Sequence, residues 1–144
     1  MSLLPAVAHA CTINESMETR LPFNSVDLSN RDRLAIADIV IKARRWPDVD
    51  IRADVFAGAY VGERDGERLK AERGALVTTY LIQLGIRPTN ILIEPKTLTD
   101  EMVRKRDGTL DLHQVVIELF PLCDGSCARL CNDPRVIPKS KVIE

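Results

Sequence analysis

No charge of one sign predominates in this sequence of 144 residues, whose formal net charge at pH 7 is −1. A nucleic-acid-binding protein would normally carry a strong excess of lysine and arginine, so this balance argues against that class. No apolar run approaches the roughly 18 residues that a membrane-spanning helix needs. The sequence also lacks an internal repeat and a low-complexity tract. With 45% hydrophobic and 28% charged residues, what remains is the composition of an ordinary globular domain.

Residue patterns typical of a catalytic centre are missing as well. No Ser-His-Asp, Cys-His or paired-carboxylate arrangement stands out, so we predict no catalytic residue and no enzyme. His113 is a single histidine in an expected strand, where a structural role is more common than that of a base or a ligand. Neither a cofactor nor a metal site is predicted.

The four cysteines are Cys11, Cys123, Cys127 and Cys131. The last three are spaced by four residues with no histidine nearby, which matches none of the common zinc patterns. An even number of cysteines suits two disulfides in an oxidising compartment. We therefore expect Cys11 to be bonded to one of the other three and the remaining two to be bonded to each other. Three connectivities stay open.

The first residues support export from the cytoplasm. Residues 3–10 (LLPAVAHA) look like the end of a signal peptide with an A-x-A cleavage site before Cys11, although the basic region and most of the apolar region are missing. We interpret residues 1–12 as a residual leader segment and expect a periplasmic location. A lipid anchor at Cys11 is the less favoured alternative, because Ala8 and His9 fit a lipoprotein signal poorly.

The central part of the chain predicts a strand, a helix and a second strand. Residues 51–57 alternate apolar and polar, which is the pattern of a strand with one face toward a core. Apolar residues recur at helical spacing over residues 67–84, and Gly85 stands where a left-handed residue would close that helix. Residues 91–93 (ILI) predict a short buried strand.

The flanking segments complete the expected fold. Residues 13–23 predict an opening strand with Met17, Thr19, Leu21 and Phe23 on one face, and residues 30–45 a helix capped by Ser29 or Asn30. A last strand is expected over residues 113–120. The order is then β-α-β-α-β-β, a two-layer α/β (α+β) sandwich whose sheet is covered on one face by two helices. Residues expected to face inward are Leu34, Ile39, Ile51, Ala53, Val55, Leu76, Tyr80, Leu81, Val115, Ile117 and Leu119.

Four motifs in this order resemble a known family. They are residues 21–28 (LPFNSVDL), residues 69–74 (LKAERG), residues 80–86 (YLIQLGI) followed by Ile91, and the turn Asp107-Gly108 before the last strand. Together they are similar to the OmpA-like peptidoglycan-associated domain over residues 20–119. The resemblance implies a mixed sheet and a domain of residues 13–121. Residues 122–144 are then a cysteine-rich appendage outside the core.

The resemblance also implies a function, the non-covalent binding of peptidoglycan. In that family an arginine forks onto a carboxylate of diaminopimelate in the stem peptide, and an aspartate takes the ammonium. Arg73 matches the arginine. The segment that should hold the aspartate reads Ala57-Gly58-Ala59-Tyr60, so the acid is absent, and Glu63 or Asp65 would have to replace it by a different geometry.

These departures weaken the expected binding. The second departure from the family pattern lies at residues 112–114 (LHQ), where the family carries two further cations. Losing one partner of a desolvated charged contact costs about 2–5 kcal/mol, so we expect peptidoglycan binding to be weak. The predicted function is that of a cell-envelope protein with this weak binding site at Arg73, Tyr60, Glu63 and Asp65. Two alternatives stay open. In the first, Arg73 binds no ligand and is a helix surface residue paired with Glu72 or Asp65. In the second, the fold serves as a periplasmic protein-interaction module (an inhibitor, immunity or assembly factor) for another envelope protein.

Overall fold

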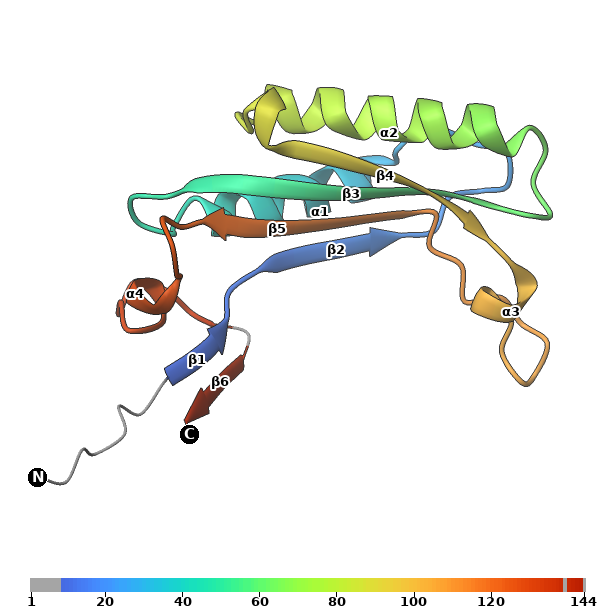
Figure 1. Ribbon diagram of the computed structural model, residues 1–144. Coiled ribbons are helices and arrows are strands. Elements are labelled where there is room, and N and C mark those ends of the chain that lie inside the picture. Colours follow the sequence, from blue (N-terminus) through green and yellow to red (C-terminus); the bar gives the residue numbers. More distant parts are fainter. Residues whose placement is uncertain (1–8, 139, 144) are drawn as a thin grey trace, which may run out of the picture.

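The computed structural model of the chain describes residues 9–138 and 140–143 (Figure 1). Its elements follow one another in the order β1 His9–Thr12, β2 Glu15–Thr19, α1 Asn30–Ala43, β3 Asp50–Tyr60, α2 Gly66–Gln83, a 3-10 turn at Pro88–Asn90, β4 Ile91–Leu98, α3 Asp100–Val103, β5 Val115–Leu122, α4 Ala128–Cys131 and β6 Ser140–Ile143.

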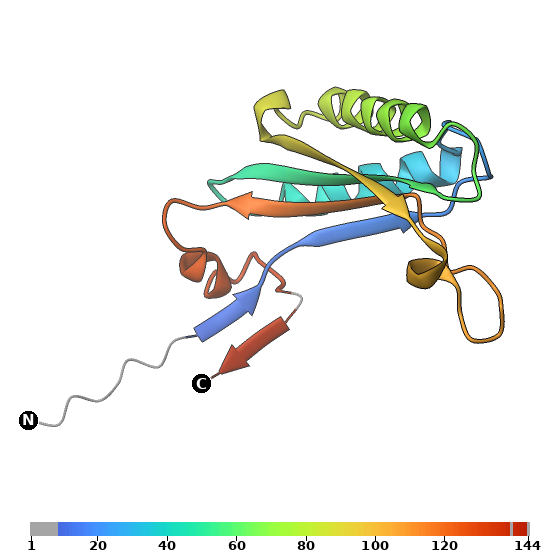
Figure 2. The same ribbon diagram turned by 45° about the vertical axis from the view of Figure 1, so that its right-hand side comes forward.

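The main sheet has four strands in the order β2-β5-β3-β4. β3 is parallel to β4 and antiparallel to β5, which in turn is antiparallel to β2, so the sheet is mixed. α1 packs against β2 and β5, while α2 packs against β3 and β4. Figures 1 and 2 show both helices on the same face of this sheet. The predicted two-layer sandwich and its β-α-β-α-β-β order are confirmed.

The core lies between that face and the two helices. Ala53, Val55 and Leu81 are fully buried there, as are the three expected residues of β5, Val115, Ile117 and Leu119. Ile51, Leu76 and Tyr80 are partly buried against the same core. The period-2 and helical patterns of the sequence therefore identified most of the inward-facing side chains correctly.

Both long helices have defined ends. Ser29 Oγ accepts a hydrogen bond of 3.1 Å from the backbone N–H of Asp32, which confirms Ser29 as the cap of α1. At the end of α2, Gly85 has a left-handed backbone with φ of 99°. Its N–H donates to Ile82 O, and the N–H of Ile86 donates to Leu81 O. This pair of bonds is a Schellman motif, as the position of Gly85 predicted.

The opening strand is shorter than the sequence suggested. β2 ends at Thr19, and the chain turns at Asn24, whose φ is 63°. Phe23 was expected on the inner face but is 50% exposed, because it follows the end of the strand. The prediction of a strand over residues 13–23 was therefore wrong in its second half, where residues 20–22 lie outside any strand and residues 22–25 form a turn closed by a bond from Ser25 N to Pro22 O.

Two further predictions need correction, and one short helix was not predicted. Leu34 of α1 was expected to face inward, but it is 71% exposed, because the apolar stripe of this helix is wider than its contact with the sheet. β4 was expected to be short and buried. It is instead an eight-residue edge strand with exposed Leu92 and Ile93, and an edge position also tolerates Pro95. The short helix α3 was not expected.

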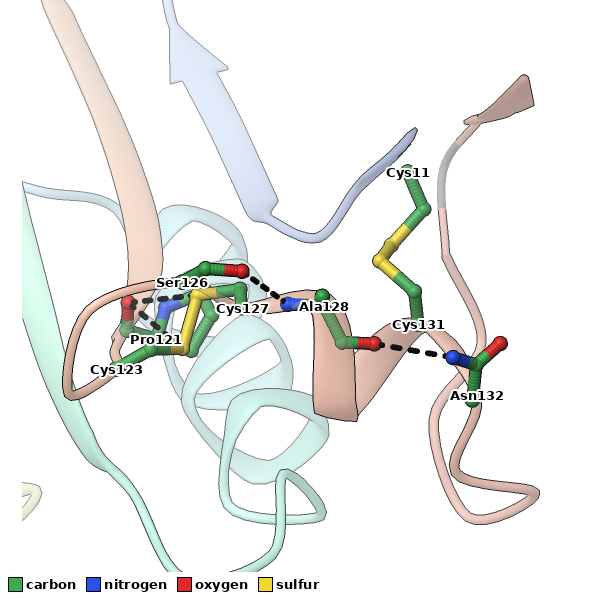
Figure 3. Close-up of a disulfide and its surroundings, with 8 residues drawn as sticks. All are labelled: Cys11, Pro121, Cys123, Ser126, Cys127, Ala128, Cys131 and Asn132. Atoms are coloured by element: carbon green, nitrogen blue, oxygen red, sulfur yellow. Dashed lines mark hydrogen bonds between the residues drawn. A yellow bond between two sulfur atoms is a disulfide. The ribbon is translucent and has the colours of Figure 1, made fainter. Parts of the chain in front are cut away.

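The four cysteines form two disulfides, Cys11–Cys131 and Cys123–Cys127 (Figure 3). This is one of the three connectivities that the sequence left open. β1 pairs with β6 in a separate two-stranded sheet, so His9–Thr12 of the expected leader segment is a paired strand, while residues 1–8 lie outside the described part. Leu130 and Val136 are buried in the main core, which the expected appendage was not predicted to reach. No helix among the described residues has the length and apolar character to cross a membrane.

Candidate functional site

Arg73 lies on the buried stripe of α2 rather than on its surface. Leu69, Arg73, Val77 and Leu81 recur every four residues and all face the sheet. The helix comes close to the sheet here because its next residue is Gly74, where an added Cβ would lie 3.0 Å from Ile93 Cγ2. The side chain of Arg73 is consequently 0% exposed.

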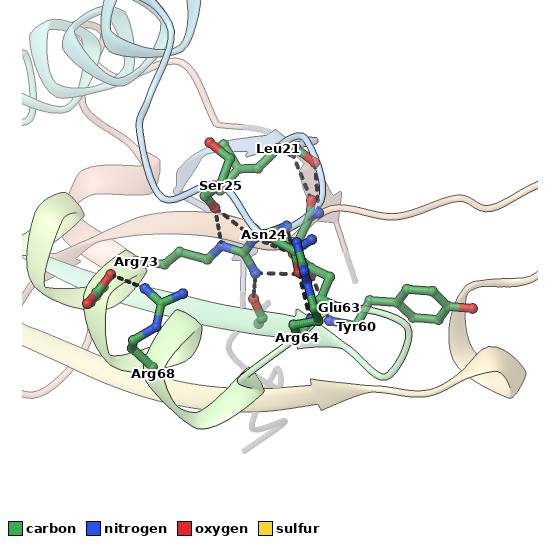
Figure 4. A network of polar contacts seen from close by, with 11 residues as sticks. Leu21, Asn24, Ser25, Tyr60, Glu63, Arg64, Arg68 and Arg73 are labelled. Atoms are coloured by element: carbon green, nitrogen blue, oxygen red, sulfur yellow. Dashed lines mark hydrogen bonds and ion pairs between the residues drawn. The ribbon is translucent and has the colours of Figure 1, made fainter.

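Glu63 reaches this buried guanidinium from the loop between β3 and α2 (Figure 4). Its Oε1 accepts hydrogen bonds from Arg73 Nη1 at 3.1 Å and from the backbone N–H of Tyr60 at 3.0 Å. Its Oε2 accepts from Arg73 Nη2 and from the backbone N–H of Asn24 at 2.9 Å. Four N–H donors from three chain segments thus converge on one carboxylate.

The guanidinium of Arg73 has no donor left over. Two N–H groups bind Glu63, and Nη1 also donates to Gly58 O at 2.9 Å. Nε and Nη2 donate to Ser25 O at 2.9 and 2.8 Å. Since arginine carries five N–H donors, every one of them is bound within the chain. We call Arg73, the N–H groups of Asn24 and Tyr60, and the oxygens of Ser25 and Gly58 the carboxylate cradle.

The cradle keeps its carboxylate ionised. Burial alone would raise the pKa of Glu63, because a charged group loses its hydration. The hydrogen bonds from Arg73, Tyr60 and Asn24 outweigh that effect and hold the pKa of Glu63 below its ordinary value. An ionised carboxylate and a guanidinium, both without solvent contact, therefore face each other at the end of β3.

Two other predicted site residues lie at the rim. The side chain of Tyr60 points away from the cradle, and its hydroxyl bonds Asp100 and Arg104. Its backbone N–H is what it contributes to the cradle. Asp65 is exposed at the start of α2 and pairs with Arg68 at 3.0 Å.

The sequence named Arg73, Glu63, Tyr60 and Asp65, and the structure brings the first three together at the cradle. The alternative that Arg73 pairs on the surface with Glu72 or Asp65 is wrong, since Arg68 holds both of those acids. Asn24 and Ser25 were not predicted as site residues. They lie in the LPFNSVDL motif, which was the available signal, but they act through backbone atoms.

Neither of the other polar side chains singled out by the sequence joins the cradle. Nε2 of His113 lies 3.6 Å from Oε1 of Glu18, and Nδ1 of His113 lies 3.7 Å from Oδ1 of Asp111. Gln114 is buried and bonds the backbone of Leu21. Within the described ranges, no three histidine, cysteine or acidic side chains are grouped in a way that would hold a metal ion.

Solved structures resemble this chain over most of its length. The OmpA-like domain of FopA1 from Francisella tularensis is 16% identical, with a TM-score of 0.51, and the match covers 83% of this chain and 82% of that one. The C-terminal domain of MotB from Helicobacter pylori is 17% identical, with a TM-score of 0.56 and coverage of 77% and 86%. This chain has an OmpA-like fold.

A second structure, the periplasmic domain of the same MotB, matches this OmpA-like fold with 18% identity, a TM-score of 0.53 and coverage of 78% and 74%. No protein-family model matches the sequence, and no curated protein matches it. At these identities the similarity establishes the OmpA-like fold alone.

Proposed function

We propose that this OmpA-like domain is a non-enzymatic, periplasmic component of the cell envelope that binds the diaminopimelate-containing stem peptide of peptidoglycan weakly. The observation that carries the proposal is the carboxylate cradle, in which a buried guanidinium and two backbone N–H groups point at one carboxylate position. A charged donor set of this kind suits the recognition of a ligand carboxylate.

The rim supplies complementary charge for the rest of the ligand. The side chain of Asp65 is 62% exposed at the start of α2, close in sequence to Glu63, where the ammonium of diaminopimelate would compete with Arg68 for its carboxylate. Tyr60 and Asp100 border the same end of the sheet. The binding is weak because Glu63 already holds the donors of Arg73, so a ligand carboxylate has to displace it.

Binding is tested with purified sacculi and a diaminopimelate-containing muropeptide. The domain should co-sediment with sacculi, and the muropeptide should produce saturable amide shifts over residues 58–73. Asp65→Asn should weaken these shifts. Asp38→Asn is the matched control, because Asp38 is an exposed helical aspartate in a surface ion pair on α1. The control should bind like the wild type.

The opposite result is equally clear. No co-sedimentation and no shifts at millimolar muropeptide would overturn peptidoglycan binding while leaving the fold intact. That result would favour the alternative stated from the sequence, in which the domain is a protein-interaction module for another envelope protein.

A further inference from the structure

Glu63 is the only buried side chain of the loop between Tyr60 and Gly66. Val61, Arg64 and Asp65 of that loop are exposed. The loop is otherwise held by backbone bonds, from Val61 N to Leu98 O at 3.0 Å and from Glu63 N to Tyr60 O at 2.8 Å, and by Asn24 Oδ1, which accepts from Arg64 N at 2.6 Å. The carboxylate of Glu63 therefore enters the cradle as an arm from an exposed loop.

The contacts of this carboxylate are those of a bound ligand. Each oxygen accepts one bond from the guanidinium and one from a backbone N–H, so all four donors belong to segments other than the loop that carries Glu63. A free carboxylate of the same shape would find the same four bonds. The three donors on Arg73 and Asn24 do not depend on the chain connection of Glu63, whereas Tyr60 precedes Glu63 by three residues and also accepts from its N–H.

We infer that Glu63 is an internal ligand that occupies a carboxylate-binding site, and that removing its side chain opens this site to a small free carboxylate. A tethered group competes with a free one because its local concentration is high. In the wild type, the apparent dissociation constant of a free carboxylate is raised by the ratio of molecules whose cradle is filled by Glu63 to molecules whose cradle is empty. The link to the stem peptide rests on the proposed function, whereas the opening of the cradle does not.

The test is chemical rescue of Glu63→Ala by acetate at neutral pH and constant ionic strength, with chloride as the comparison salt. Acetate should raise the unfolding midpoint of this variant in a saturable way and shift the amides of Asn24 and Tyr60. The wild type should respond equally to both salts. The matched control is Glu67→Ala, since Glu67 is an exposed acid of the same region. It too should respond equally to both salts.

Glu63→Gln separates an empty cradle from a merely altered one, because glutamine fills the same space without the charge. It should show no acetate-specific rescue. If Glu63→Ala does not fold in chloride, the yield of folded protein after refolding in acetate is the readout. A higher yield in acetate supports the inference. Equal behaviour of Glu63→Ala in the two salts, by either readout, would overturn it.

A muropeptide titration of Glu63→Ala in chloride separates this inference from the proposed function. If the cradle is the stem-peptide site, this variant should bind the muropeptide at least about tenfold more tightly than the wild type. Acetate rescue without muropeptide binding would support the internal ligand and remove peptidoglycan as its competitor. Muropeptide binding to the wild type without acetate rescue of the variant would support the proposed function and overturn the internal ligand.

Discussion

Gln114 holds the backbone of Leu21 by two hydrogen bonds of 2.8 Å each, one accepted by its Oε1 and one donated by its Nε2. The side chain thus replaces a partner strand at the point where β2 has already ended. Both residues are buried. The bond pair fixes the start of the segment that brings Asn24 and Ser25 to Arg73, and the backbone oxygen of Gln114 accepts from the N–H of Gly58 at 2.6 Å, so Gln114 positions the cradle without binding Arg73 or Glu63.

Gln114→Leu should destabilise the domain by about 2–4 kcal/mol, because it leaves the buried N–H and C=O of Leu21 without partners. Urea unfolding measures the loss. Gln83→Leu is the control, since Gln83 is exposed at the end of α2 and should change stability by less than about 0.5 kcal/mol. Equal effects of the two substitutions would show that the contact to Leu21 is unimportant.

The ion pair of Glu63 and Arg73 should be strongly coupled. Glu63→Ala and Arg73→Ala should each cost about 3–5 kcal/mol, because each leaves an uncompensated buried charge. The double variant should cost clearly less than the sum, since no charge then remains buried. A double-mutant cycle by chemical denaturation measures the coupling, and strictly additive losses would contradict it.

The same pair predicts an acid-sensitive stability. Because the pKa of Glu63 is lower in the folded protein than in the unfolded chain, its contribution is complete above the unfolded value of about 4.3 and is lost as pH falls through the folded value. Unfolding free energies of wild type and Glu63→Gln should therefore converge below about pH 4. Asp100, Asp107 and Asp133 also have lowered pKa values, but they are present in both proteins and cancel in the comparison. A constant difference at all pH values would rule this mechanism out.

The two disulfides should differ in their effect on stability. Cys11–Cys131 spans 120 residues of sequence and Cys123–Cys127 spans 4. In the chain-entropy model the first contributes about 5 kcal/mol and the second about 2 kcal/mol. Denaturation of the paired serine variants compares them directly. Mass spectrometry of the native protein should find no alkylated thiol, and four alkylated thiols would contradict both bonds.

Residue periodicity predicted the parts of the fold that depend on one face of one element. Val55, Val115 and Leu81 were placed correctly because alternate or fourth residues share a face. Ile93 was misplaced for a different reason. Its strand lies at the edge of the sheet, and the order of strands is decided by distant pairing that a local pattern does not contain.

The candidate site shows a second limit of sequence patterns. Arg73 and Glu63 were named, yet their pairing was not, because it depends on how a five-residue loop folds back onto α2. Ser25 and Gly58 bind Arg73 through carbonyl oxygens, which any residue type would offer. Residue identity therefore carries no information about these contacts, and only the backbone geometry reveals them.

The Cys11–Cys131 bond also determines how the domain would carry mechanical load. β1 and β6 lie together at the end of the molecule opposite the loop between β3 and α2 (Figure 1). Tension applied between residues 9 and 143 would run through the covalent bond and bypass residues 12–130. The main sheet and the carboxylate cradle would then carry no tension, because the disulfide would bear the force. Reduction of Cys11–Cys131 would transfer that force to β2 and β5.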